Sequence, residues 1–598
     1  MIPAYGASDC LRACLNSLLE YAPADCTVYV LDDATPDGSI LTACNSVPRE
    51  RLQLHYLRSD VNRGFVQTSN WGVREIQSSE EDILLLNSDT EVTAGSIQEM
   101  QAVLELHEKH AVVTPRSNNA SIYSVPWNGD RLDPAESFDI WKRIRTLSPR
   151  YHVMPTAVGF CMLIRREAVN QFGLFDEIYG LGYNEENDFV CRINRYGYSA
   201  VAANWAFVFH YGCASFGSKR DQLEATNRKL LDERYPEYER SISDYAHFHV
   251  DPVENFAILF APHRPRILFD LFHLAPRRCD LSDFALNLLR EISRLMENDT
   301  DLYIGMGDSQ AFFANELRGY RIYDDHPNSS MLFDLVFKPS GISFLSEFQR
   351  MNRVSPRVTF TLLDVTGARC QYLYPADRRM TIRRTAELAD CVFTISDFSR
   401  RDFAAFYGSD LPMRVIYPGT NLYATEAESR GGEYVLVIGN GYAHDGVSEA
   451  VQHLNGQFSV VTWPNREDLS AREMRDLLLG ANVVVYPSHQ EDFGLRVIDS
   501  LGLGKPVVVL DNAINREIAG VTHDTNLHRI SSLECLQATV QSLFDTPPAP
   551  PPSPPRRWRA AAEEYAAAFR AILSRDIDVT KLRDRWETLR MLELLNRV

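Results

Sequence analysis

Two acidic strings in this chain have the composition that metal and proton chemistry requires. The apolar run Leu84–Leu86 ends abruptly in the string Asn87–Asp89. This pattern predicts a buried strand that delivers a carboxylate to the carboxyl edge of a sheet, where open α/β sheets bind their ligands. The string Glu185–Asp188 places three carboxylates in four residues, directly before a helical pattern. One set could hold a divalent cation on a phosphate, and the other could take a proton from a hydroxyl.

Asp89 is the candidate metal ligand of the first string. Mg²⁺ and Mn²⁺ favour oxygen ligands, usually one or two carboxylates together with substrate phosphate oxygens. His210 ends the apolar strand pattern of residues 200–209 and would bring an imidazole to the same edge of the sheet. A histidine that is merely hydrogen-bonded in a core is the equal alternative.

The second string reads as the first turn of a helix that ends near Gly197. Acidic residues in a first turn commonly balance the helix dipole, which is the structural alternative here. Three clustered carboxylates also raise one another's pKa, and a raised pKa suits a general base.

Two further motifs could contact a nucleotide. Asp32 and Asp33 follow the strand pattern of residues 27–31 and could accept hydrogen bonds from a base or a ribose, although capping the next helix explains them equally well. In Asn62-Arg63-Gly64, the glycine allows close backbone approach and Arg63 could neutralise a diphosphate. In isolation, this motif is an ordinary loop.

Size and charge limit the classes of protein. The chain has 598 residues, 45% of them hydrophobic, which predicts three or four folding units. Its formal charge of −19 argues against a nucleic-acid partner. Eleven cysteines without C-x-x-C pairs favour free thiols and a cytoplasmic location. There is no apolar run of ~20 residues and no signal peptide. Because the first strand pattern starts at Ile2, we expect that a few upstream residues are missing.

The pattern of elements predicts an α/β protein with two successive parallel-sheet systems. Strands and helices alternate over residues 1–125, and a second series runs from about 265 to 545. The proline-rich segment 547–555 predicts a stiff spacer, followed by amphipathic helices over 558–573 and 579–595. The predicted divisions are a first domain (1–250), two lobes of a second module (265–425 and 426–575) and a helical tail (576–598).

Residues 2–216 resemble glycosyltransferase family 2, the inverting GT-A type with a Rossmann-like fold. The motifs that carry the resemblance are Ile2-Pro3-Ala4-Tyr5, Leu31-Asp32-Asp33, Asn62-Arg63-Gly64-Phe65, the string 85–92 that contains Asn87-Ser88-Asp89, Ser117-Asn118-Asn119-Ala120, Gly173-Leu174-Phe175-Asp176, the string 182–188 that contains Glu185-Glu186, and His210-Tyr211-Gly212. Eight ordered motifs over some two hundred residues make the match specific.

The resemblance implies a role for each matched residue. Asp32 and Asp33 would contact the nucleoside, Asp89 with His210 would hold Mn²⁺ or Mg²⁺, and Glu186, next to Glu185, matches the base that deprotonates the acceptor. The nucleotide-sugar contacts would be Pro3, Tyr5, Asp32, Asp33, Asn62, Arg63, Ser88 and Asp89. Asn87 replaces the first acid of the family's D-x-D motif, so the metal would be held by fewer charges.

Residues 265–575 resemble GT-B enzymes of glycosyltransferase family 4, which have two Rossmann-like lobes. The matching strings are 394–400, 415–419, 435–440, 486–488, 491–495 and 502–508. The implied donor site would contain Gly439, Asn440, Glu491, Gly494 and Asp499.

Four departures put that second donor site in doubt. Asp445 stands where relatives place a phosphate-binding Lys or Arg, and Asp499 replaces the second Glu of an E-x7-E pattern. Cys279–Leu281 replaces a glycine-bearing turn, and Leu363-Asp364 replaces a His-Asp pair. A non-catalytic scaffold and a second, retaining transferase both remain open.

These resemblances imply an inverting, metal-dependent glycosyltransferase of bacterial surface polysaccharide synthesis. The donor would be a UDP- or dTDP-sugar, carrying for example rhamnose or N-acetylhexosamine, and the acceptor a glycan or lipid-linked glycan. One alternative is an enzyme with two active modules, and another is a non-catalytic carbohydrate-binding protein. Arg556, Arg557 and Arg559 around Trp558 could contact the inner face of the cytoplasmic membrane, although a solvated helix face is the favoured interpretation.

Overall fold

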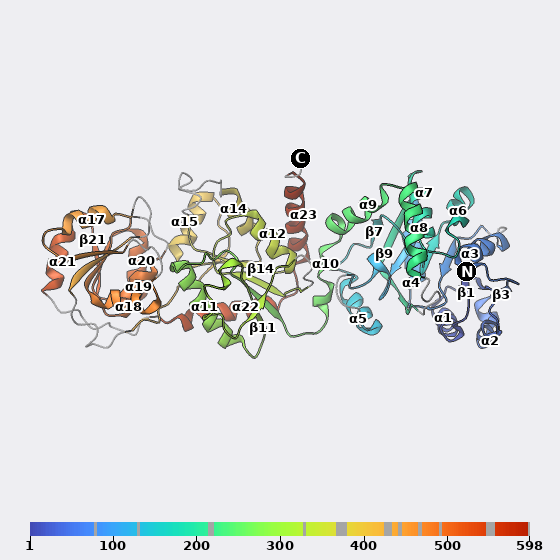
Figure 1. Ribbon diagram of the computed structural model, residues 1–598, viewed down its shortest axis with the longest axis horizontal. Coiled ribbons are helices and arrows are strands. Elements are labelled where there is room, and N and C mark those ends of the chain that lie inside the picture. Colours follow the sequence, from blue (N-terminus) through green and yellow to red (C-terminus); the bar gives the residue numbers. More distant parts are fainter. Residues whose placement is uncertain are drawn as a thin grey trace. The chain divides into compact units, whose positions relative to one another are not determined.

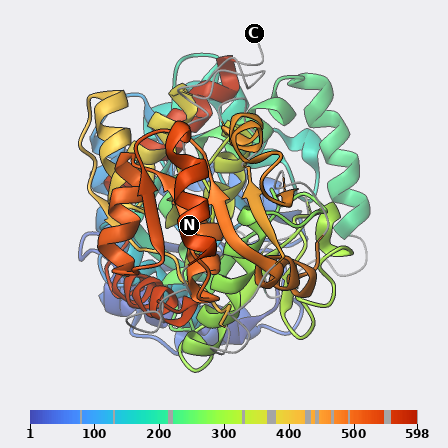
Figure 2. The same ribbon diagram turned by 90° about the vertical axis from the view of Figure 1, so that its left-hand side faces the viewer.

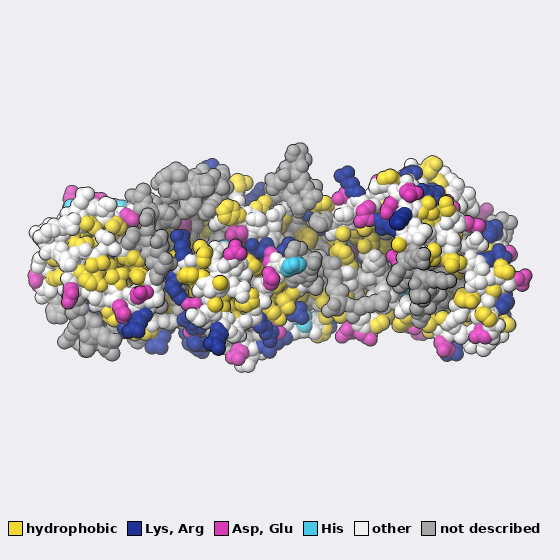
Figure 3. Space-filling view, viewed as in Figure 1, with side chains coloured by type: hydrophobic (Ala, Val, Ile, Leu, Met, Phe, Trp, Pro, Cys, Tyr) yellow, Lys and Arg dark blue, Asp and Glu magenta, His cyan; other side chains and the backbone are white. Residues whose placement is uncertain are grey.

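Two compact units make up the computed structural model, Met1–Pro262 (unit 1) and His263–Val598 (unit 2). The structure describes residues 1–76, 80–127, 132–212, 220–326, 331–365, 379–423, 433–439, 445–463, 469–489, 493–545 and 556–595. Figure 1 shows the chain coloured along its sequence. Acidic, basic and apolar side chains are mixed over the face of each unit that Figure 3 shows.

Unit 1 is a mixed α/β unit, as its alternating pattern predicts. Its strands are β1 (Ile2–Ala4), β2 (Val28–Asp32), β3 (Leu54–Arg58), β4 (Ile83–Leu86), β5 (Thr90–Val92), β6 (His110–Arg116), β7 (Tyr151–Met154), β8 (Cys161–Ile164) and β9 (Ser199–His210). Its helices are α1 (Ser8–Tyr21), α2 (Ser39–Asn45), α3 (Gly64–Glu75), α4 (Ser96–Glu105), α5 (Pro134–Ile144), α6 (Arg166–Phe172), α7 (Glu185–Asn194), α8 (Arg220–Arg234), α9 (Tyr238–Asp244) and α10 (Pro252–Asn255).

The strands of unit 1 pair in two groups that Met1 connects. β1, β2 and β3 are parallel, and the other group has the order β4-β8-β6-β9-β5, with β7 on β9. The Leu86 N–H donates to the carbonyl of Met1 (3.0 Å), and the Met1 amine donates to the carbonyl of Leu84 (2.8 Å). The carboxyl ends of β1, β2 and β4 therefore lie along one edge. Several of the residues predicted to bind the nucleotide and the metal lie at this edge.

Unit 2 has two lobes, each built on a parallel sheet. The first lobe contains β10 (Arg266–Asp270), β11 (Asp301–Gly305), β12 (Arg321–Tyr323), β13 (Leu335–Lys338), β14 (Val358–Leu362), β15 (Cys391–Thr394), β16 (Met413–Val415), α11 (Asp280–Met296), α12 (Leu345–Val354), α14 (Arg379–Leu388) and α15 (Asp397–Tyr407). The second contains β17 (Tyr434–Ile438), β18 (Val460–Trp463), β19 (Ala481–Tyr486), β20 (Val507–Leu510), β21 (Leu527–Ile530), α17 (Val447–Leu454), α18 (Ala471–Gly480), α19 (Leu495–Gly502), α20 (Ala513–Thr522) and α21 (Leu536–Phe544).

Both sheets of unit 2 have the strand order of doubly wound folds. The first lobe reads β12-β11-β10-β13-β14-β15-β16, and the second reads β18-β17-β19-β20-β21. The order reverses between β10 and β13 and between β17 and β19, the switch points at which such sheets bind ligands. Helices flank the strands of the second lobe on either side (Figure 2). The predicted α/β class with a two-lobed second module is confirmed.

The last two helices, α22 (Trp558–Leu573) and α23 (Val579–Leu595), belong to the first lobe and not to the second. The Tyr565 ring packs on Phe337 and Phe393, and its hydroxyl lies 3.0 Å from Thr361 Oγ1. In Figure 1 both helices lie among the green elements of the first lobe. The predicted second-lobe range of 426–575 therefore includes a helix that completes the first lobe.

The structure also corrects the membrane prediction. Trp558 is 4% exposed and packs edge-on against Phe284, so its ring is not available to lipid. Arg556 donates to the carbonyl of Tyr417, and Arg559 pairs with Glu563. No helix in the described ranges combines the length and the apolar character needed to cross a bilayer. None of the nine cysteines that the structure describes forms a disulfide. The predicted polyproline spacer lies outside the described residues.

Candidate active site

Strand register brings Asp89 and His210 together. β5 is antiparallel to β9, with Thr90 opposite His210. Asp89 immediately precedes β5, and its carbonyl accepts a hydrogen bond from the N–H of Tyr211 at 3.1 Å. The Asp89 Oδ1 atom consequently lies 3.6 Å from His210 Nε2, with both side chains mostly buried. The structure thus places these two predicted metal ligands at one point.

The contacts of His210 leave Nε2 as the atom that faces Asp89. Its Nδ1 lies 2.6 Å from the carbonyl oxygen of Asn119, which can only accept, so Nδ1 carries the proton. The Phe160 ring stacks on the imidazole at 5.2 Å. A neutral imidazole held in this way presents its Nε2 lone pair, the form that binds a metal.

One carboxylate and one imidazole suit a borderline cation such as Mn²⁺, completed by phosphate oxygens of a substrate. In the described part of the chain, no group of three or more His, Cys, Asp or Glu side chains is placed to hold a metal. Asp89 and His210 would fit a cation that binds together with a substrate phosphate.

Asp32 and Asp33 lie at the end of β2, and both have structural partners. Asp32 is fully buried and accepts hydrogen bonds from the hydroxyl of Tyr56 and from Arg58, both at 2.6 Å. Asp33 accepts from the N–H groups of Arg63 (2.7 Å) and Gly64 (2.8 Å) at the start of α3. Asp33 thus binds the start of α3 and does not cap the next helix α2, as the alternative expected, and a nucleotide contact by either acid stays a prediction.

The other predicted nucleotide contacts surround the same edge. Pro3 lies in β1, and Tyr5, directly after it, is 49% exposed. Asn62 is exposed and Ser88 is half-buried. The Arg63 side chain donates to Ser59 Oγ (2.9 Å) and lies over the Trp71 ring, so in this structure it is held by the protein.

The turn before α7 packs onto the start of α3. Leu181 lies so close to Gly64 that a Cβ there would be 3.0 Å from the Leu181 Cα atom, and Gly64 has φ +78°. The Phe65 N–H donates to the carbonyl of Leu181 at 3.2 Å. Only glycine allows this approach without strain. The loop that carries the acidic string is thereby fixed beside the loop that holds Asp33.

The three carboxylates of α7 have different surroundings. Asp188 is fully buried between Arg192 (3.2 Å) and Arg234 (3.0 Å), which makes it an anchor between α7 and α8. Glu185 is 4% exposed, and its Oε2 atom has no hydrogen-bond partner. Burial, and secondarily the neighbouring Glu186, raise the pKa of Glu185 well above its usual range.

Glu186 is half-buried, and burial raises its pKa to about 7. The charge of Glu224 raises this pKa further, while backbone N–H groups oppose the shift. A carboxylate with this pKa near neutral pH can both accept and release a proton. Among the three acids, Glu186 therefore has the properties of a general base.

A short loop connects Glu186 to the proposed metal ligands. Thr156 Oγ1 contacts the side chain of Asn187, the residue after Glu186, while Phe160 packs on His210. Thr156 and Phe160 are four residues apart, so their Cα atoms are within ~14 Å of each other. Residues 156–160 thus contact both the residue after Glu186 and the candidate metal ligand His210.

Sequence reasoning missed Asn227 of α8, which is 5% exposed. Its Nδ2 donates to the carbonyls of Tyr179 (2.9 Å), Gly182 (2.7 Å) and Tyr183 (3.2 Å). Tyr183 and Asn184 both have positive φ, 73° and 72°, which costs about 1–3 kcal/mol for each non-glycine residue. Asn227 therefore supports the strained turn that positions Glu186. A lone Asn in a polar helix carries no sequence signal of this role.

Among the described residues of the predicted donor site of unit 2, Gly439 and Asp499 lie close to other side chains of the unit. A Cβ on Gly439, at the end of β17, would lie 2.8 Å from Asp445 Oδ2, so an anion covers the strand end where a phosphate would bind. Gly494 starts α19 with φ +66°. Asn440 and Glu491 lie outside the described residues.

Arg496 of α19 fills the rest of this region. It is 3% exposed and pairs with Asp499 (3.0 Å) in its own lobe and with Asp280 (2.8 Å) and Asp283 (2.6 Å) of the first lobe. Asp499 also accepts a hydrogen bond from Thr420 at 2.6 Å. The acid expected to bind a nucleotide therefore already has two protein partners.

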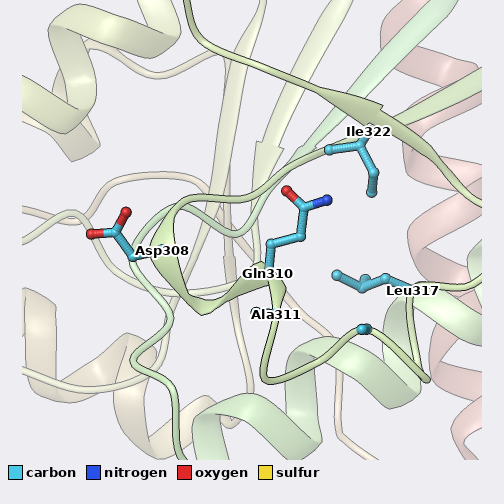
Figure 4. A pocket seen from close by; sticks show the side chains of 6 residues that line it. Asp308, Gln310, Ala311, Leu317 and Ile322 are labelled. Atoms are coloured by element: carbon cyan, nitrogen blue, oxygen red, sulfur yellow. The ribbon is translucent and has the colours of Figure 1, made fainter.

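A cavity of 430 Å³ lies elsewhere in the first lobe, beside β11 and β12. Figure 4 shows the Gln310 amide between Ile322 and Leu317, with the Asp308 carboxylate turned away from them. None of the predicted site residues lines it.

Family models match both units. Residues 1–173 match the model described as "Glycosyl transferase family 2", and residues 431–565 match "Glycosyl transferases group 1". The two predicted resemblances are thereby confirmed. The chain has an N-terminal glycosyl transferase family 2 module and a C-terminal GT-B-type module.

Among curated proteins, a D-inositol 3-phosphate glycosyltransferase of Segniliparus rotundus is 27% identical over 162 residues, which cover 24% of this chain and 34% of that protein. The chain thus spans about a third of the length of this relative.

Solved structures are more distantly similar. The sucrose-phosphate synthase of Thermosynechococcus elongatus has 15% identity and a TM-score of 0.36, over 56% of this chain and 98% of that chain. Anabaena Alr3699/HepE in complex with UDP and glucose has 13% identity and a TM-score of 0.36, over 56% and 100%. GalNAc-T7 with UDP, GalNAc and Mn²⁺ has 15% identity and a TM-score of 0.31, over 44% and 52%.

We expect Asn227→Ala to loosen the turn before α7. The variant leaves buried carbonyls without a donor, which costs about 1–3 kcal/mol. Peptides covering residues 179–190 should exchange amide hydrogen about tenfold faster by mass spectrometry. The matched control is Asn70→Ala, which removes a similar amide pair, to the N–H and carbonyl of Phe175, without touching the turn. Unchanged exchange in the Asn227 variant would contradict this role.

We expect Arg496→Met to destabilise unit 2 by about 3–5 kcal/mol, because three carboxylates lose their shared cation. Urea unfolding followed by tryptophan fluorescence measures the loss. Arg516→Met is the control, since Arg516 is exposed and its pair with Asp511 contributes about 0–1 kcal/mol. Equal stability of the two variants would show that the Arg496 cluster is not a structural element.

Proposed function

We propose that this chain is a metal-dependent, inverting glycosyltransferase whose working site lies in unit 1. The observation that carries the proposal is the pairing of Asp89 with His210 across β5 and β9 at 3.6 Å, together with Glu186 in the first turn of α7. The family 2 match over residues 1–173 supports the same assignment of that unit. The donor would be a UDP- or dTDP-sugar, and the acceptor a glycan or a lipid-linked glycan.

The proposed reaction is a single displacement at the anomeric carbon. Glu186 accepts the proton of the acceptor hydroxyl while its oxygen forms the new bond to that carbon. The bond to the diphosphate breaks on the opposite face, and the electron pair leaves with the diphosphate, so the configuration inverts. When bound, a divalent cation would supply positive charge against the departing diphosphate. Asp89 and His210 would hold that cation.

The burial of Glu185 separates the roles of the two adjacent acids. Burial, and secondarily the charge of Glu186, raise the pKa of Glu185 well above its usual range, which favours its protonated form. A protonated Glu185 is neutral and adds no second negative charge beside Glu186. Glu185 would then support the ionised form of Glu186 and would not take the acceptor proton itself.

Unit 2 fits the role of a non-catalytic scaffold in this proposal. Asp445 covers the end of β17, and Arg496 neutralises the acid that would otherwise face a nucleotide. The alternative, a second retaining transferase, requires the Arg496 cluster to open. We place the enzyme in the cytoplasm and in bacterial surface polysaccharide synthesis, and the reduced state of the nine described cysteines supports the compartment.

Glu186→Gln should abolish transfer. Loss of a general base lowers kcat by about 10²–10⁴-fold, while donor binding measured by calorimetry should not change. Because only the ionised carboxylate accepts a proton, kcat/KM of the wild type should rise with pH through about 7 and then level. Glu224→Gln should shift this rise in kcat/KM to lower pH and leave its maximal value unchanged, since Glu224 raises the pKa of Glu186.

The same variant separates one active module from two. With a panel of nucleotide sugars, wild-type product mass should report the addition of one kind of sugar, and Glu186→Gln should form none. A residual product of different mass in Glu186→Gln would establish a second active site. Undiminished turnover would remove Glu186 from the mechanism.

Chelation should stop transfer, and Mn²⁺ or Mg²⁺ should restore it. His210→Ala removes one of the two proposed protein ligands. The metal concentration that gives the half-maximal rate should therefore rise by at least about tenfold. The matched control is His107→Ala, at an exposed position outside this site. Full activity of the wild type in excess chelator would refute metal dependence, and donor binding without any turnover would favour a carbohydrate-binding protein.

A further inference from the structure

A cavity of 330 Å³ lies beside the proposed metal ligands of unit 1. It is formed by the loop after β6 and by the start of α5, and Asn118, Asn119, Trp127 and Leu132 are among the residues that line it. Its volume is at the lower end of the ~300–1,000 Å³ that ligand pockets occupy. The cavity therefore has room for a small ligand group and not for an extended glycan.

The wall of this cavity is also the support of His210. Asn118 Nδ2 donates to the His210 carbonyl at 3.0 Å, and Asn118 Oδ1 accepts from the His210 N–H at 2.9 Å. The Asn119 carbonyl accepts from His210 Nδ1 at 2.6 Å. Two residues that line the cavity thus also contact His210.

The same loop reaches toward Glu186. The Tyr123 hydroxyl, fully buried, donates to the carbonyl of Thr156 at 2.7 Å, and Thr156 contacts Asn187. None of the predicted nucleotide contacts is among the described residues that line this cavity. We therefore assign the cavity to the acceptor and not to the nucleotide.

The lining chemistry defines the kind of ligand. Ten described residues line the cavity, and none of them is Lys, Arg, Asp or Glu. Amide and hydroxyl groups, including those of Asn118, Asn119 and Ser121, alternate with apolar side chains such as Ile122 and Trp127. A charged group buried here would find no opposite charge among these ten described residues, which is costly. This mixture suits an uncharged ring that has hydroxyl groups at its edge and an apolar face.

Trp127 supplies an independent indication of a ligand. Its indole Nε1 is buried and has no hydrogen-bond partner. A buried donor without an acceptor is unfavourable, and buried Trp N–H groups usually find a partner. A hydroxyl oxygen of a bound sugar would provide one, while the indole ring would contact the apolar face of that sugar.

We propose that this cavity binds the terminal, uncharged monosaccharide of the acceptor and selects against acidic or phosphorylated sugars. This inference rests on the proposed function of unit 1 and names its acceptor class. The asparagines then couple acceptor binding to the position of His210, since both line the cavity and contact His210, Asn118 through its side chain and Asn119 through its carbonyl.

Saturation-transfer NMR on the full chain tests the proposal. The probes are the methyl glycosides of glucose, rhamnose and N-acetylglucosamine, with methyl glucuronide as the charged comparison. We expect saturation transfer to at least one neutral glycoside and none to the glucuronide. Trp127→Phe keeps an aromatic ring and removes the N–H, so it should weaken binding about tenfold. Trp127→Ala should abolish the signal.

The matched control is Trp205→Phe, because Trp205 lies on β9 outside the cavity and its Nε1 donates to the carbonyl of Ser148. Binding should be unchanged in this variant. Leu132→Trp, which fills the cavity without altering Trp127, should also abolish binding, and a thermal melt establishes that each variant is folded. Signals that persist in both Trp127→Ala and Leu132→Trp, or a preference for the glucuronide, would overturn the proposal.

Metal-dependent donor hydrolysis, measured on the same variants, separates this proposal from the function on which it rests. We expect Trp205→Phe, the control outside the cavity, to hydrolyse donor at the wild-type rate. Glycoside binding that depends on Trp127, without donor hydrolysis in the wild type, would support the cavity and refute the proposed function. Donor hydrolysis without binding of any neutral glycoside would refute the cavity alone.

Discussion

The antiparallel register of β5 on β9 is the constraint on which the candidate site depends. It sets Thr90 opposite His210, and only in this register does the residue before β5 lie beside the end of β9. A shift of one residue would turn the side chain at position 210 to the other face of the sheet. The 3.6 Å separation of Asp89 Oδ1 and His210 Nε2 is therefore a property of strand pairing, and the Asn119 and Phe160 contacts only orient the imidazole.

A second constraint is the turn before α7, which uses unfavourable backbone to place an acid. Positive φ at Tyr183 and Asn184 is maintained because Asn227 binds three carbonyls and because Leu181 packs against Gly64. The same packing joins this turn to the helix that Asp33 caps. The three acids then differ in their surroundings. Asp188 is paired with arginine and anchors α7, while burial raises the pKa of Glu186 to about 7.

In unit 2, several charged side chains near the predicted donor site pair with one another. The parallel sheets and their switch points are intact. At the switch point of the second lobe, however, an anion covers Gly439. The buried ion cluster of Arg496 with Asp280, Asp283 and Asp499 links the two lobes. The charged groups of this cluster pair with one another within the protein. These ion pairs favour the arrangement of the two lobes in which they form.

The sequence by itself determined the class of each unit and the positions of most elements. Apolar runs such as Ile83–Leu86 and the periodicity of Trp558–Leu573 are local, so they specify a strand and a helix without reference to the rest of the chain. It also identified Asp89, Glu186 and His210 as candidates, because strand ends and clustered acids are visible in one dimension. The eight ordered motifs located the module that the family model matches over residues 1–173.

Tertiary structure decided what these residues contact. Asp32 and Asp33 follow the same strand, yet one is held by Tyr56 and Arg58 and the other caps a distant helix. Helix α22 follows the second lobe in sequence but completes the first, because Tyr565 fits between Phe337 and Phe393. The roles of Asn227 and Trp127 arise from groups distant in sequence or from a cavity wall. Burial and long-range hydrogen bonds depend on the folded chain, and no local pattern encodes them.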